Sequence, residues 1–172
     1  MIINLPKKRK DVMSRILIIA LLLISAAVWS QDLKKAPSFS LENAEGKQIS
    51  LDSILVKGPV LLNFWASWCK PCKEELPEFN KIKNDYSSKG LNVVLVTIDK
   101  PAAFTKAKSF LRTKGFELEL LKDCDQKVIK SFGGGESVPY TFLIDTEKNI
   151  TFRKKGQTSY NELLKEVKKV IK

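Results

Sequence analysis

The chain contains two nearly continuous apolar segments, at residues 60–66 and 91–98. Apolar runs of this kind are typical of strands that are buried on both faces of a sheet. Residues 69–88, which follow the first run, have a helical composition with apolar residues spaced three apart. Pro77 lies inside this stretch, so we expect the helix to be kinked there. The pattern therefore predicts a buried strand, a helix and a second buried strand in succession.

The rest of the chain alternates between the same two kinds of element. A hairpin is predicted within residues 38–51, because a Glu45-Gly46 turn separates two short stretches of strand character. Gly115 is expected to end a helix at 102–113, and Gly133 a short helix at 125–132. The remaining elements, in order, are a helix at 102–113, a strand at 117–121, a short helix at 125–132, strands at 140–144 and 150–153, and a final helix that Ser159 caps.

This order of elements predicts the fold class. Strands that alternate with helices and then end in a hairpin and a helix favour an α/β fold with a mixed central sheet flanked by helices. The domain is expected to span residues 37–172, a length that suits a single domain. Residues 31–36 are mostly polar and are followed by Pro37, so we interpret them as a linker.

Residues 1–30 have the pattern of a targeting segment. Residues 7–10 are all basic, and an apolar run from residue 16 to residue 28 is interrupted only by Ser25. A basic start followed by a short apolar run is typical of a secretory signal peptide. The sequence therefore predicts export to a periplasmic or other extracytoplasmic compartment.

The fate of this leader stays open at the level of sequence. Val28 and Ser30 suit signal cleavage before Gln31. The alternative is an uncleaved membrane anchor, in which residues 16–29 tether the protein. Met13 is a second candidate start, because a complete signal follows it.

Composition and charge restrict the chemistry. Lys and Arg number 30 against 19 Asp and Glu, the net charge is +11, and there is no histidine. The absence of histidine excludes Ser-His and Cys-His catalytic pairs and His-ligated zinc. Residues 1–30 hold five basic residues and one acidic residue, so the chain from residue 31 keeps a net charge of +7. Nucleic acid is not expected as a partner of an exported protein, whereas a basic surface favours acidic proteins or anionic head groups.

The sequence Trp68-Cys69-Lys70-Pro71-Cys72 lies at the predicted junction between strand and helix. Free N–H groups and the positive dipole end at a helix start stabilise a thiolate, so the pKa of Cys69 is expected to be lowered. Lys70 adds a positive charge, and Pro71 suits the first turn, where its missing N–H is not needed. Cys72 is expected to point inward as the resolving thiol. The motif predicts a redox-active Cys69–Cys72 disulfide that works without a metal or another cofactor.

Two other roles for the cysteine pair are less consistent with the sequence. A static disulfide across two residues closes a very small loop and constrains the unfolded chain little. A zinc site needs four ligands, and the chain offers only Cys124 in addition. Because Asp123 and Asp125 flank Cys124 and raise the pKa of a neighbouring thiol, we expect it to be free and partly buried. An intermolecular disulfide through Cys124 is the alternative in an oxidising compartment.

The same residues carry a resemblance to a known family. Residues 64–72, Phe-Trp-Ala-Ser-Trp-Cys-Lys-Pro-Cys, resemble the active-site segment of thioredoxins. Glu75-Leu76-Pro77 is similar to the TlpA/ResA-like branch of exported thiol-disulfide oxidoreductases, and Val138-Pro139 matches the cis-proline of the family. The resemblance covers residue 37 to the end. It implies a thioredoxin-like fold with an N-terminal β-hairpin and with an inserted helix and strand between the CxxC helix and the cis-proline.

The resemblance also implies a proton-transfer group. Asn63 occupies the position of a buried aspartate that assists proton transfer in thioredoxin, and an amide cannot titrate. Glu75 lies one helical turn after Cys72 and matches a glutamate that is semi-buried beside the thiol pair in the exported branch. The hypothesis is that Glu75 is the general acid and base for Cys72, with a pKa raised by desolvation. The alternative is a surface carboxylate.

Three further residues are implied in client binding. A cis Pro139 is expected to present the backbone of Val138, so that it pairs with an extended client peptide. Trp68 is expected to cover the Cys69 thiolate. These residues complete the predicted site.

The sequence as a whole predicts an exported protein-disulfide reductase that acts on protein clients. In an oxidising compartment the thiol pair would not stay reduced unaided, so a membrane-embedded thiol reductant donor is implied. The resemblance suggests cytochrome c maturation as one client pathway. A disulfide donor or isomerase with the same fold is one alternative. A copper carrier is another, although its thiols lack supporting soft ligands, because the two methionines, Met1 and Met13, lie in the leader.

Overall fold

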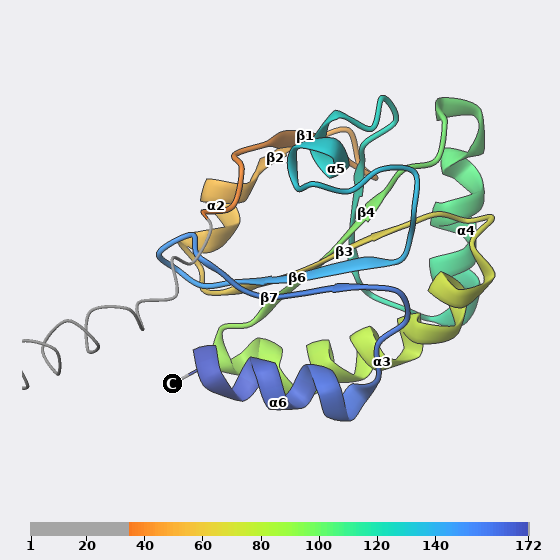
Figure 1. Ribbon diagram of the computed structural model, residues 1–172. Helices are drawn as coiled ribbons and strands as arrows, with labels where there is room; N and C mark the ends of the chain where they lie inside the picture. Colours follow the sequence, from red (N-terminus) through yellow and green to blue (C-terminus); the bar gives the residue numbers. More distant parts are fainter. Residues whose placement is uncertain (1–34, 172) are drawn as a thin grey trace, which may run out of the picture. The chain divides into compact units, whose positions relative to one another are not determined.

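The first apolar run forms strand β3 (Val60–Trp65), and all six of its residues are buried. The structure, a computed structural model, describes residues 35–171 (Figure 1). Within them β3 pairs in parallel with β4 (Asn92–Thr97) and antiparallel with β6 (Tyr140–Ile144). The full sheet has seven strands in the order β2-β1-β5-β4-β3-β6-β7. The predicted mixed sheet is confirmed, and the active-site strand lies inside it.

The outer strands and the helices follow the predicted order. The hairpin, β1 and β2, pairs with β5 through β1, and β7 pairs with β6 at the other edge. The outer strands are β1 (Ser40–Asn43), β2 (Gln48–Ser50), β5 (Glu119–Lys122) and β7 (Ile150–Lys155). The α-helices are α2 (Leu51–Leu55), α3 (Lys70–Tyr86), α4 (Phe104–Lys114), α5 (Lys127–Ser131) and α6 (Tyr160–Val170), and short 3₁₀ turns occupy Ser87–Lys89 and Pro101–Ala103.

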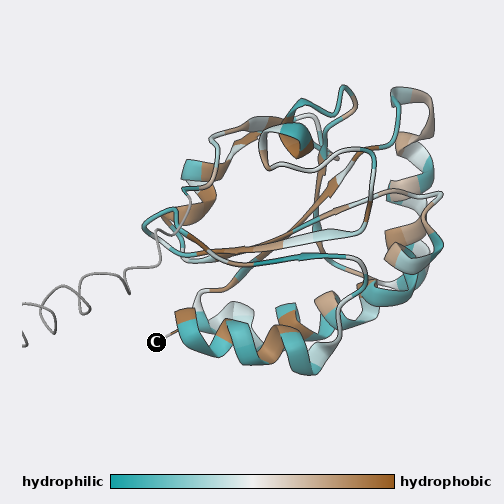
Figure 2. Ribbon diagram, in the orientation of Figure 1, coloured by the Kyte–Doolittle hydropathy of each residue, from teal (hydrophilic) through white to brown (hydrophobic). Residues whose placement is uncertain are grey.

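Helices cover both faces of the sheet. Successive side chains of β3 point to opposite faces, so Phe64 packs against Phe132 after α5, whereas Trp65 packs against Phe110 of α4. Helices α3 and α6 lie together along one face (Figure 1). Figure 2 shows that apolar residues gather on the strands and on one side of these helices. The buried side chains form one hydrophobic core.

Helix boundaries follow from local signals in the sequence. Ser159 caps α6 as predicted, because its side chain accepts the N–H of Glu162. Gly115 ends α4 with a φ of 67°, a conformation that suits glycine. Helix α3 continues through Pro77, and the expected kink stays a prediction.

The structure differs from the sequence prediction in one element and several boundaries. Residues Leu51–Leu55 form helix α2, which the sequence analysis did not predict, where the second hairpin strand was expected to end at residue 51. The Ser50 side chain caps α2 by accepting the N–H of Ser53. A helix of five residues is too short to show the periodicity on which the prediction relied. Strand β7 also extends two residues beyond its expected end, to Lys155.

The leader and most of the predicted linker lie outside the described residues. The last two linker residues are described, and both contact the turn between β6 and β7. Lys35 pairs with Asn149, and the N–H of Ala36 donates to the carbonyl of Lys148 at 2.8 Å. Within residues 35–171, no helix has the length and apolar character needed to cross a membrane.

Candidate active site

Cys69 is positioned by the turn that joins β3 to α3. The N–H of Cys69 donates to the carbonyl of Ala66 at 3.1 Å and closes this turn. Cys69 is the N-cap of α3, and its sulfur accepts the N–H of Cys72 at 3.2 Å. A free helical N–H therefore points at the sulfur, in the arrangement that stabilises a thiolate.

The two cysteines of the motif are bonded to each other but differ in access. A disulfide joins Cys69 to Cys72, with Cα atoms 5.3 Å apart. Cys69 is 4% exposed and Cys72 is fully buried. Both residues are buried, and only Cys69 keeps a small exposed fraction, so Cys69 is the more accessible of the two.

The loop before β6 lies against the disulfide. The carbonyl oxygen of Val138 is 3.6 Å from the sulfur of Cys69. The Val138–Pro139 peptide bond is cis, in agreement with the resemblance. Segments 69 residues apart in the sequence are thus brought together at one sulfur atom.

The other motif residues lie at the surface beside Cys69. Trp68 is 63% exposed and is one of two large hydrophobic residues that are exposed in the described part of the chain. Lys70 is the first residue of α3, with Pro71 in the same turn, and its exposed side chain pairs with Glu74 at 3.9 Å. An exposed ion pair at this distance contributes little to stability. The side chains of Trp68 and Lys70 are therefore accessible to a partner protein.

Glu75 is buried, so the surface-carboxylate alternative is wrong. Its side chain is 1% exposed, and its two oxygens each accept one hydrogen bond. The amide nitrogen of Asn63 donates to one oxygen, and the backbone N–H of Thr158 donates to the other, both at 2.8 Å. Burial raises the pKa of Glu75 to about 7, although both hydrogen bonds and the charge of Lys154 act in the opposite direction.

Lys154, Thr158 and Glu162, which the sequence analysis did not single out, complete the surroundings of Glu75 together with Asn63. The Asn63 amide nitrogen also donates to the hydroxyl of Thr141 at 3.0 Å, while its oxygen is buried without a partner. Lys154 pairs with Glu162, which also accepts the Thr158 hydroxyl at 3.1 Å. Strand β3, strand β6 and the segment before α6 thus all contribute to one polar cluster.

A second buried acid contacts the active-site turn. Asp99 follows β4 and is fully buried, and its carboxylate accepts the N–H of Ser67 at 2.9 Å. The sequence analysis missed both residues. The available signal was an acid directly after the carboxyl end of a buried strand, where sites in α/β folds commonly lie.

Cys124 is a free, partly buried thiol, as predicted. Burial is the main cause that raises its pKa, and the neighbouring charges of Asp123 and Asp125 add to it. The expected rise in the pKa of Cys124 is confirmed, but the flanking carboxylates contribute less to it than burial does. Among residues 35–171, no three His, Cys, Asp or Glu side chains cluster in a way that could hold a metal ion.

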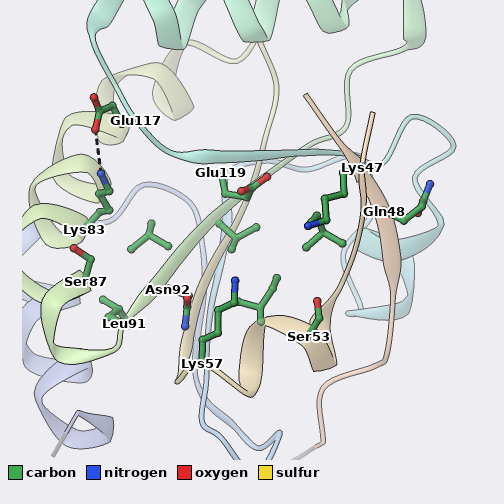
Figure 3. Close-up of a pocket in the computed structure, with 14 residues that line it drawn as sticks. Lys47, Gln48, Ser53, Lys57, Lys83, Ser87, Leu91, Asn92, Glu117 and Glu119 are labelled. Atoms are coloured by element: carbon green, nitrogen blue, oxygen red, sulfur yellow. Dashed lines mark hydrogen bonds and ion pairs between the residues drawn. The ribbon is translucent and has the colours of Figure 1, made fainter. Parts of the chain in front are cut away.

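A groove of about 570 Å³ lies at the opposite end of β4 (Figure 3). Lys47, Lys57 and Lys83 line it together with Glu117 and Glu119, and Lys83 pairs with Glu117 at 3.5 Å. It contains no cysteine and contacts none of the predicted site residues. The groove is therefore separate from the disulfide, which follows the carboxyl end of β3.

Comparison with known proteins agrees with this geometry. The model of the AhpC/TSA family matches residues 33–153. The chain belongs to the AhpC/TSA family. It is similar to the thiol-disulfide oxidoreductase ResA of Bacillus thuringiensis, with 34% identity over 137 residues. The matched region covers 80% of this chain and 77% of the relative. It is also similar to the thioredoxin-like protein YneN of Bacillus subtilis, with 36% identity over 121 residues. This match covers 70% of this chain and 68% of YneN.

A solved structure supports the same assignment. The chain is similar to a thiol:disulfide interchange protein of the thioredoxin family from Chlorobium tepidum, with a TM-score of 0.71 and 26% identity. The match covers 83% of this chain and 99% of the other. The predicted thioredoxin-like fold and the resemblance to TlpA/ResA-like proteins are confirmed. Like its relatives, this family member is a thiol-disulfide oxidoreductase.

The raised pKa of Glu75 predicts a pH-dependent stability. Between the ordinary carboxyl pKa of 4.5 and about 7, the folded state keeps a proton that the unfolded state has released. The free energy of unfolding is therefore expected to fall as pH rises through this window, by up to about 3 kcal/mol, and to stay level above it. Denaturant unfolding of the oxidised protein and of Glu75→Gln across this pH range measures the effect.

The difference between the two proteins isolates Glu75 from other titrating groups. Asp123, whose pKa burial also raises, contributes equally to both curves. Parallel stability curves for the wild type and Glu75→Gln would contradict the prediction.

Proposed function

We propose that this oxidoreductase is an extracytoplasmic protein-disulfide reductase that acts through Cys69 and Cys72. The observation that carries the proposal is the difference in access between the two sulfurs. Cys69 keeps 4% exposure and lies beside the Val138 carbonyl, whereas Cys72 is fully buried. Such a pair can attack a client disulfide with one thiol and complete the exchange with the other.

The reaction begins with reduced protein. The Cys69 thiolate attacks one sulfur of the client disulfide, so a Cys69–client disulfide forms while the other client sulfur leaves as a thiolate and takes up a proton. The Cys72 thiolate then attacks the sulfur of Cys69, and the remaining client sulfur leaves. The client gains two electrons and two protons, and the Cys69–Cys72 disulfide forms.

Glu75 is proposed as the base that takes the proton of Cys72. It lies one turn further along α3, and its pKa of about 7 makes both protonation states accessible near neutral pH. In the reverse direction the protonated acid returns the proton to the Cys72 thiolate. Asn63 and Thr158 hold the carboxyl group in place for both steps.

Client recognition is proposed at the surface around Cys69. In the reduced protein the carbonyl oxygen of Val138 is a hydrogen-bond acceptor for an extended client backbone, which Pro139 presents. Trp68 supplies exposed aromatic surface for the residues next to the client disulfide. Lys70 adds a positive charge at the rim, which favours acidic clients.

The cellular setting is proposed from the leader and the redox chemistry. Residues 1–30 are taken as an export signal or as an anchor whose residues 16–29 form a membrane tether. A membrane-embedded thiol reductant donor would regenerate the dithiol, because an oxidising compartment drives it toward the disulfide. Cytochrome c maturation is proposed as one client pathway, as the resemblance to TlpA/ResA-like proteins suggests.

Two alternatives use the same cysteines. A disulfide donor or isomerase would run the exchange with the opposite outcome, and the reduction potential separates it from a reductase. A copper carrier would hold Cu(I) between the two thiols. Metal analysis of the reduced protein after incubation with Cu(I) would identify a carrier by one tightly held copper per chain.

Replacement of each cysteine should give a distinct result. Cys69→Ser is expected to abolish disulfide reduction, because the remaining thiol of the pair, Cys72, is fully buried. Cys72→Ser is expected to accumulate the mixed disulfide with the client, which non-reducing electrophoresis detects. Cys124→Ser is the matched control and should reduce insulin at the wild-type rate. Reduction of insulin by Cys69→Ser would contradict the mechanism.

Loss of the Glu75 carboxyl group should change the pH profile of exchange. The rate at which Cys72 resolves the mixed disulfide is expected to depend on an ionisation near pH 7 in the wild type and to lose that dependence in Glu75→Gln. The rate is expected to fall about a hundredfold, within the usual range for a general acid or base. Stopped-flow measurements from pH 5 to about 9 test this, and identical profiles would remove Glu75 from the mechanism.

The reduction potential of the Cys69–Cys72 pair tests the direction of electron flow. Equilibration against thiol buffers is expected to give a value near or below about −250 mV, as in thioredoxin. A value near or above about −150 mV, toward the strong oxidants, would instead indicate a disulfide donor. The Cys69–Cys72 pair would then remain the proposed reactive site, but electrons would flow from the client to it.

A further inference from the structure

The proposed exchange reaction does not use the buried carboxylate of Asp99. Asp99 is fully buried and lies two residues after Thr97, the last residue of β4. A buried carboxyl group is costly unless its oxygens are hydrogen-bonded, so the partners of Asp99 indicate what it stabilises. All of its hydrogen bonds go to the end of β4 and to the turn before Cys69.

The contacts of Asp99 are specific. One carboxylate oxygen accepts the N–H of Ser67 at 2.9 Å and the hydroxyl of Thr97 at 2.7 Å. The other oxygen accepts the hydroxyl of Ser67 at 3.0 Å. The N–H of Asp99 donates to the Thr97 hydroxyl at 3.2 Å, which fixes the acid relative to its own strand.

Ser67 is the residue through which these bonds reach the active site. It is the second residue of the turn from Ala66 to Cys69, and the Ala66 carbonyl closes that turn. Trp68 and Cys69 follow Ser67 directly. The turn therefore cannot shift without breaking the two hydrogen bonds that Ser67 donates to the buried side chain of Asp99.

We propose that Asp99 is a positioning residue, which holds the Ser67 turn so that Trp68 and the Cys69 sulfur are presented to a client. The inference rests on the proposed function, because it assigns to Asp99 a role in attack by Cys69. Geometry carries this role, since both carboxylate oxygens are used for hydrogen bonds to Ser67. The charge of Asp99 is not needed for it.

The chain offers a matched control in Asp123. This acid is also fully buried at the carboxyl end of a strand, β5. Its carboxylate accepts the N–H groups of Val128 and Ile129 in α5, at 3.1 and 2.8 Å. Its loss should therefore weaken the fold without displacing the turn before Cys69.

The experiment measures single-turnover reduction of insulin by the reduced proteins, together with their denaturant unfolding. Asp99→Ala is expected to reduce insulin about tenfold to a hundredfold more slowly, as for other misplaced reacting groups. Asp99→Asn should stay within about threefold of the wild type, because its oxygen can accept the bonds of Ser67 N–H and Thr97 while its nitrogen donates to the Ser67 hydroxyl. Asp123→Ala should be less stable, yet as fast as the wild type.

Each contrary result has a definite meaning. The inference is wrong if Asp99→Ala reduces insulin at the wild-type rate, if Asp99→Asn is as slow as Asp99→Ala, or if Asp123→Ala is equally slow. If Asp99→Ala does not fold, Ser67→Ala decides, because it removes one of the two bonds to the turn. A clear decrease in its rate is expected, and an unchanged rate would overturn the role.

Failure of the proposed function is distinguishable from failure of this inference. A wild-type protein that reduces no protein disulfide would remove the reductase proposal. The reaction of Cys69 with a small aromatic disulfide such as dithiobis(nitrobenzoate) needs only a correctly placed thiol. The same order of variants is expected in that reaction, and any other order would overturn the role of Asp99.

Discussion

The arrangement of the site depends on keeping one carboxyl group in the core. Glu75 lies on α3. Its carboxyl group accepts one hydrogen bond from the Asn63 side chain of β3 and another from the backbone N–H of Thr158, before α6. Withdrawal of a carboxylate from water is unfavourable, and two donors offset only part of that cost. The central strand, the active-site helix and the last helix are therefore held in one geometry by a group that is poised between its two protonation states. The two oxygen atoms of Glu75 therefore affect stability and are also the proposed site of proton transfer.

The second organising feature is the parallel pairing of β3 with β4. Because Trp65 lies opposite Thr97, the residues after both strands emerge side by side. One strand leads to Cys69 and the other to Asp99, and the antiparallel β6 begins at the same end, just after Pro139. Three segments distant in the sequence thus contribute a thiol, a buried acid and a backbone carbonyl to one small region. The groove at the other end of β4 has lysines and glutamates but no reactive sulfur.

The sequence predicted those parts whose signals are local. The apolar runs of β3 and β4, the cap at Ser159 and the cysteine motif each depend on a few adjacent residues, and the resemblance added Glu75 and Pro139. Contacts between distant segments could not be predicted, because no periodicity relates Glu75 to the N–H of Thr158, 83 residues away. The bonds between Ser67 and Asp99 span 32 residues and have the same difficulty. Helix α2 was missed for the opposite reason, since five residues are too few for a pattern.

Lys35, the first described residue, lies at the opposite end of β3 from the Cys69–Cys72 disulfide. Lys35 pairs with Asn149 in the turn after β6, and this turn is next to the start of β3, because Ile144 lies opposite Val60. Cys69 follows the other end of β3, and a strand of six residues is about 20 Å long. Whatever is joined to the domain through Lys35 is therefore fastened at the end remote from the sulfur atoms. Lys35 and the Cys69–Cys72 disulfide thus lie toward opposite ends of β3.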